Sequence, residues 1–106
     1  MTFSASLSLQ DSSAVIELEG ELDSSTAPAF RSTIERVVGS DVDTLVLEMT
    51  KLDYMSSAGL RGLVFARQKM GDGVEIVLVN PNSVVAQTIQ LVGLNHSVTI
   101  RDRVVE

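Results

Sequence analysis

The sequence predicts an α/β domain with a mixed, mostly parallel sheet of four to five strands and about three helices. Apolar runs rich in strand-forming residues alternate along the chain with stretches of helical periodicity. The connections are short, so consecutive strands after the first pair are expected to be parallel with right-handed crossovers. With 106 residues, 44% hydrophobic and 21% charged, the whole chain 1–106 is expected to form one domain around a single core.

The chain is expected to open with an antiparallel strand pair. Apolar and polar residues alternate over residues 3–9, and turn-forming residues separate this run from residues 14–22. In the second run Ile16, Leu18 and Leu22 share one parity, and three glutamates occupy the other. One face of these strands must therefore remain in water, which places the helices on one face of the sheet.

The first helix is expected between a cluster of N-cap residue types at 23–26 and Gly39. Pro28 suits its first turn. The expected apolar stripe consists of Ala27, Phe30, Ile34, Val37 and Val38.

Residues 44–49 form an apolar run that predicts a third strand, and this strand leads into a helix. The helix is expected from about Ser57 to Met70, with Gly71 ending it. Its core-facing residues are expected to be Leu60, Leu63, Val64 and Met70.

The C-terminal part is expected to add a strand, a helix and a last strand. Residues 74–79 are apolar almost throughout, as in a strand covered on both faces. Residues 80–83 break the chain and begin a third helix, residues 97–100 form the last strand, and residues 101–106 form a polar tail. The core side of the third helix is expected at Val85, Ile89 and Val92.

Composition argues against several functional classes. A net charge of −6 and a pI near 4.6 disfavour binding to nucleic acid or to an anionic membrane surface. No apolar run approaches the roughly 20 residues that span a bilayer, so membrane insertion is not expected. The N-terminus lacks the basic region of a signal peptide and the chain has no cysteine, so a cytoplasmic location is expected.

Enzymatic and metal-binding patterns are also missing. A serine hydrolase would need a base, but the nucleophile-elbow spacing is absent and His96 is forty residues from the serines. Residues 57–62 lack the glycine spacing and the lysine of a P-loop. His96 is the single histidine and has no cysteine to complete a metal site.

The candidate site is the stretch at residues 52–65, where the third strand meets the second helix. Ser56 and Ser57 lie at a helix N-terminus, where backbone N–H groups point outward, although the pair could serve only as an N-cap. Likewise, the whole role of Asp23 could be to cap the first helix. Phe65 falls outside the apolar stripe of its helix, so it is either an exposed anchor for a partner or tucked under a loop.

Three segments, residues 20–23, 52–60 and 92–94, resemble the STAS family in residue type and position, and the resemblance covers essentially the whole chain. STAS domains are the domains of bacterial anti-sigma factor antagonists and also occur in the tails of anion transporters. The resemblance implies a serine in the loop before the second helix that a partner serine kinase, itself an anti-sigma factor, phosphorylates. The unphosphorylated antagonist captures that kinase and frees the sigma factor. It also implies a PP2C-type phosphatase as partner, a monomer or weak homodimer, and no catalytic residue, cofactor or metal.

The loop departs from the family pattern at one position. The best-known members have Asp-Ser-Ser/Thr-Gly-Leu, whereas here Ser56, Ser57 and Ala58 precede Gly59, which puts Ala58 at the usual acceptor position. The acceptor is therefore expected at Ser57, with Ser56 as the alternative. Gly59, which has no Cβ, is expected to let a partner approach closely. Partner contacts are expected at Asp23, Ser24, Asp53, Met55, Ser56, Ala58, Gly59, Leu60, Arg61 and Phe65.

Phosphorylation of Ser57 is expected to block partner binding without unfolding the domain. A phosphoryl group adds about −1.5 to −2 charge, which a helix N-terminus favours by roughly 0.3–1 kcal/mol. In a docked complex the phosphoryl group would lose its water and meet the negative charges of nearby Asp23 and Asp53, and both effects would oppose partner binding.

The alternative function is a STAS interaction module in a complex without a sigma factor, such as a phospholipid-transport ABC system or a secretion or biofilm signalling pathway.

Overall fold

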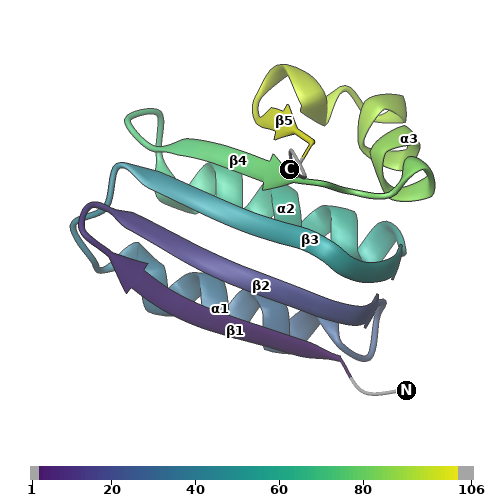
Figure 1. Cartoon of the computed structure of the whole chain (residues 1–106), viewed down its shortest axis with the longest axis horizontal. Helices are drawn as coiled ribbons and strands as arrows, with labels where there is room; N and C mark the ends of the chain where they lie inside the picture. The colour runs from purple at the N-terminus through teal and green to yellow at the C-terminus, as the bar shows by residue number, and fades with distance from the viewer. Residues whose placement is uncertain (1–2, 103–106) are drawn as a thin grey trace, which may run out of the picture.

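The computed structural model describes residues 3–102, which form a five-stranded sheet with the strands in sequence order (Figure 1). The strands are β1 (Ser4–Gln10), β2 (Ser13–Leu22), β3 (Thr44–Met55), β4 (Glu75–Val79) and β5 (Thr99–Arg101). The helices are α1 (Ala27–Val38), α2 (Ser57–Met70) and α3 (Ser83–Leu91), followed by the 3-10 turn η1 (Leu94–His96). β1 is antiparallel to β2 and every other pair is parallel, which confirms the predicted mixed, mostly parallel sheet.

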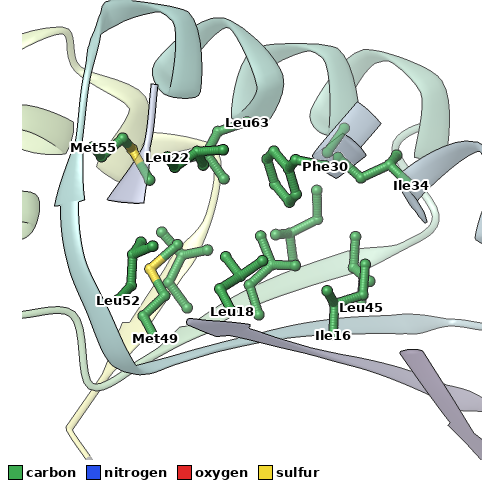
Figure 2. Close-up of a cluster of buried hydrophobic side chains, with 14 of the residues drawn as sticks. Ile16, Leu18, Leu22, Phe30, Ile34, Leu45, Met49, Leu52, Met55 and Leu63 are labelled. Atoms are coloured by element: carbon green, nitrogen blue, oxygen red, sulfur yellow. The ribbon is translucent and has the colours of Figure 1, made fainter. Parts of the chain in front are cut away.

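The core lies between the sheet and the helices α1 and α2, which cover one face (Figure 1). Figure 2 shows Phe30 and Leu63 from the helices above Leu18 and Met49 from the strands; each is at most 1% exposed. α3 adds two buried side chains to the same core. Each such residue contributes about 1.5–3 kcal/mol by leaving water, so this one-sided core holds the layers together.

β4 is buried on both faces, as its apolar sequence predicts. Ile76 and Leu78 point to the core, and Val77, on the opposite parity, is only 3% exposed. No helix within residues 3–102 has the length and apolar character needed to cross a membrane.

β3 is longer than the strand expected at 44–49, because it continues to Met55. The cause is its neighbour β2, a strand of ten residues whose backbone remains available for pairing as far as Leu22. Two shifts in register allow the second half of β3 to follow β2, so that Leu22 pairs with Met55. The expected loop before α2 is therefore a strand end, held against β2 up to the residue before Ser56.

Three valines expected in the core are exposed: Val38 at 40%, Val64 at 39% and Val92 at 58%. On α2 the buried residues are Leu60 and Leu63, as expected, together with the small residues Gly59, Gly62 and Ala66. A Cβ on Gly62 would lie 2.7 Å from Cδ2 of Phe30, so the ring of Phe30 occupies the space above this glycine. Val64 consequently points away from the core.

The C-terminal segment also differs from expectation. η1 was not predicted, and β5 begins at Thr99 rather than at residue 97. Arg101 belongs to β5 and is not part of a polar tail, and the remainder of that expected tail, residues 103–106, lies outside the described residues.

Candidate functional site

Ser56 fixes the start of α2 with its side chain and its backbone. It is the N-cap residue, in extended conformation, and its Oγ accepts a hydrogen bond from the Ala58 N–H at 3.2 Å. Its own N–H donates to the carbonyl of Leu22 at 2.9 Å, and its carbonyl accepts from the Leu60 N–H at 3.0 Å. Ser56 therefore caps α2 with its hydroxyl and joins β2 to α2 through its backbone.

Ser57 is the first residue of α2 and is exposed. Within residues 3–102 its Oγ accepts or donates no hydrogen bond, in contrast to that of Ser56. The hydroxyl lies at the helix N-terminus, where unpaired N–H groups and the helix dipole favour negative charge. The two adjacent serines thus have different roles: Ser56 is structural, and Ser57 presents a free hydroxyl.

Asp23 builds the turn between β2 and α1. Its Oδ1 accepts from Ser25 Oγ at 2.7 Å, from the Ser25 N–H at 2.9 Å and from the Thr26 N–H at 3.2 Å. These bonds, led by that from the Ser25 hydroxyl, lower the pKa of the Asp23 carboxyl below its usual value. The N-cap of α1 is Thr26, whose hydroxyl donates to the Glu21 carbonyl at 2.8 Å. Asp23 therefore stabilises the turn before α1, and the N-cap position itself belongs to Thr26.

Three of the expected partner-contact residues lie in the core. Met55 is 4% exposed, Leu60 is 9% exposed, and Gly59 is buried. A Cβ on Gly59 would lie 2.7 Å from Cγ of Met55 and 2.9 Å from Cγ of Leu22. The expectation that Gly59 leaves room for a partner is wrong: its missing side chain makes room for the packing of α2 on the strand ends.

Asp53 is exposed near the end of β3, and its backbone is tied to the start of α3. The Nδ2 of Asn82 donates to the carbonyls of Leu52 and Asp53, each at 3.2 Å. The Oδ1 of the same residue accepts from the Val85 N–H at 2.9 Å and caps α3. Asn82 was expected only as a helix start, because its link to β3 depends on contacts between distant segments.

Three predicted site residues, Ser24, Ala58 and Arg61, meet in one open groove of about 460 Å³ between α1 and the start of α2. The opposite wall, which was not predicted as part of the site, consists of Ala27, Pro28, Arg31, Ser32 and Glu35. The helical spacing of these α1 residues is visible in the sequence. Their position opposite Arg61 follows only from the packing of Phe30 on Gly62.

Phe65 is half-buried, between the exposed and the covered positions expected for it. Cζ of Arg31 lies 4.5 Å from the centroid of its ring, and Nζ of Lys69 lies 5.7 Å from it. Both distances fit cation–π contacts. Phe65 thus contacts Arg31 of the neighbouring helix, and its expected contact with a partner stays a prediction.

The described part of the chain contains no group of three or more His, Cys, Asp or Glu residues that could hold a metal ion. The site instead offers a free hydroxyl at a helix N-terminus, an ordered acidic turn and a groove with two arginines. Such an arrangement can present a surface to a protein partner and accept a charged modification.

Comparison with known proteins gives a consistent result. A family model for the STAS domain matches residues 5–106. The anti-sigma-F factor antagonist RsfB of Mycobacterium tuberculosis is 33% identical over 82 residues, which cover 77% of this chain and 67% of RsfB. An anti-sigma factor antagonist from Mycobacterium paratuberculosis superimposes with a TM-score of 0.86 at 25% identity, covering 94% of this chain and 86% of that protein.

Bacillus SpoIIAA in its phosphorylated form has a TM-score of 0.75 at 22% identity, covering 97% of this chain and 92% of SpoIIAA. Since the family model spans nearly all of the sequence and RsfB shares a third of the aligned residues, the chain belongs to the STAS domain family.

Proposed function

We propose that this protein is an anti-sigma factor antagonist that binds an anti-sigma factor when Ser57 is unmodified and releases it when Ser57 is phosphorylated. The observation that carries the proposal is the difference between the two serines. Ser56 Oγ is engaged by the Ala58 N–H, whereas Ser57 is exposed with a free hydroxyl. A kinase can reach Ser57 without breaking the start of α2.

The relatives support the same function. RsfB is named an anti-sigma-F factor antagonist, and an anti-sigma factor antagonist shares 25% of residues with this chain on the same fold. SpoIIAA, which shares the fold, has been solved in an unphosphorylated and in a phosphorylated form.

The proposed switch acts on binding and leaves the fold intact. A phosphate on Ser57 adds about −1.5 to −2 charge at the positive end of α2. The helix dipole stabilises this charge by roughly 0.3–1 kcal/mol. In a docked complex the same group must lose its water, at a cost of several kcal/mol unless the partner supplies cations. The domain then remains folded while the complex dissociates.

In this account the protein is a substrate and catalyses no reaction itself. The kinase is the anti-sigma factor, and a PP2C-type phosphatase restores the unmodified form. The free hydroxyl of Ser57 serves as the acceptor in the first reaction and is regenerated in the second.

The test is phosphorylation by the anti-sigma factor kinase of the same genome, purified and incubated with this protein and ATP. Trypsin cleavage after Lys51 and Arg61 releases a peptide of residues 52–61 that contains both serines. We expect one phosphate on this peptide, unchanged in Ser56→Ala and lost in Ser57→Ala. A phosphate found only outside residues 52–61, or one lost in Ser56→Ala alone, would refute the assignment.

A further inference from the structure

We propose that the groove between α1 and α2 is part of the partner interface and receives an acidic side chain of the anti-sigma factor. This inference rests on the proposed function and specifies the chemistry of the partner. Its basis is the charge of the groove, which differs in sign from that of the chain.

The groove is locally basic on an acidic protein. The chain has 14 acidic and 8 basic residues and a net charge of −6. The groove is lined by Arg31 and Arg61 against a single carboxylate, Glu35, so its own formal charge is positive. An anionic group is therefore favoured in this groove relative to the chain as a whole, whose net charge is negative.

Both guanidinium groups are available to a ligand. Within residues 3–102 neither Arg31 nor Arg61 forms a salt bridge; the ion pairs of the described chain are Lys51 with Glu19 and Arg101 with Glu75. Glu35 lies one helical turn after Arg31, yet no ion pair joins them. Arg31 lies over the ring of Phe65 instead, at 4.5 Å from the centroid.

The stack on Phe65 prepares Arg31 for binding. An arginine held by an aromatic ring loses less side-chain freedom when it binds, and its planar donors match the two oxygens of a carboxylate. Arg61 is on the opposite wall, one helical turn after Ser57. A carboxylate bound between them would lie beside the proposed phosphorylation site, so one partner surface can cover both.

The apolar lining favours a side chain over a small free anion. Ala27, Pro28 and Ala58 contribute to the walls, and about 460 Å³ is sufficient for an aspartate or glutamate carried on a partner segment. The neighbouring hydroxyls of Ser24 and Ser32 can donate to the same carboxylate or to a backbone carbonyl of the partner residue that carries it.

The experiment measures the affinity of the purified anti-sigma factor for unmodified protein by isothermal titration calorimetry. Arg31→Gln and Arg61→Gln should each weaken binding by roughly threefold to tenfold, and Glu35→Gln should strengthen it by about twofold to threefold. Arg36→Gln is the matched control, because Arg36 is an exposed arginine of α1 outside the groove. Its affinity should equal that of the wild type.

The opposite signs separate recognition from loss of structure, since a damaged fold cannot raise affinity. If Arg31→Gln unfolds because the stack on Phe65 is lost, Arg61→Gln and Glu35→Gln still decide the question. If the wild type binds and Arg31→Gln, Arg61→Gln and Glu35→Gln all have the affinity of Arg36→Gln, the groove is not part of the interface. The proposed function would still stand. Failure of the wild-type protein to bind would overturn the proposed function, and this inference with it.

Discussion

Replacing Gly59 with alanine tests the packing that positions the site. The new Cβ would lie 2.7 Å from Cγ of Met55 and 2.9 Å from Cγ of Leu22, both of them buried core side chains. Overpacking of this kind costs about 1–3 kcal/mol, and alanine regains about 0.5–1 kcal/mol as the better helix former. The two terms leave a net loss of about 0–2.5 kcal/mol, and we expect about 1–2 kcal/mol in the free energy of unfolding because both contacted atoms are Cγ atoms and not flexible side-chain ends.

For a domain of this size that loss corresponds to a fall in Tm of roughly 4–10 °C, measured by circular dichroism. The matched control is Gly39→Ala at the C-cap of α1, where φ is −85° and nothing lies within 4 Å of the added Cβ. This control should be neutral or stabilised by up to about 1 kcal/mol. If Gly59→Ala is as stable as Gly39→Ala, α2 does not pack on the strand ends as described.

Three further predictions concern the ends of the elements around the site. Asn82→Ala should lower the free energy of unfolding by about 1–3 kcal/mol in urea titrations, because it removes the cap of α3 and two hydrogen bonds to β3 carbonyls. Ser57→Asp should leave Tm within a few degrees, as expected for an exposed residue at a helix N-terminus; a molten variant would show the hydroxyl to be structural. Asp23 has a lowered pKa in the folded state, so its carboxylate stabilises the fold above the unfolded pKa of about 3.9, and this contribution is lost as pH falls through the folded pKa. The wild type should therefore exceed Asp23→Asn in stability at pH 7, and the difference should close on acidification below about pH 4; a constant difference would contradict the role of its hydrogen bonds.

The order of elements could be predicted from the sequence because it depends on local patterns. Alternation in β2, the apolar stripe of α1 and the glycines after the helices each reflect the geometry of their own segment. The end of β3 could not be predicted in this way. Residues after Met49 extend as a strand because β2 continues beside them, and a neighbour in space leaves no periodicity in the sequence.

In the candidate site, too, some features follow from local sequence and others depend on contacts between distant segments. The helix start at Ser56 and the exposure of Ser57 follow from residue types that favour helix N-termini. The burial of Gly59 depends on the packing of α2 against Leu22 at the end of β2, and the contact of Arg31 with Phe65 depends on the packing of α1 against α2. Both contacts join residues more than thirty positions apart in the sequence. The exposed hydroxyl could therefore be predicted from the sequence, whereas the α1 wall of the groove could not.

The most direct test of the central claim compares the affinity of the anti-sigma factor for unmodified protein and for protein phosphorylated at Ser57. Both forms should melt within a few degrees of each other, since the phosphate lies at an exposed helix N-terminus. We expect the unmodified form to bind and the phosphorylated form to bind at least about a hundredfold more weakly, which corresponds to about 2.7 kcal/mol. Equal affinity of the two folded forms would contradict the account.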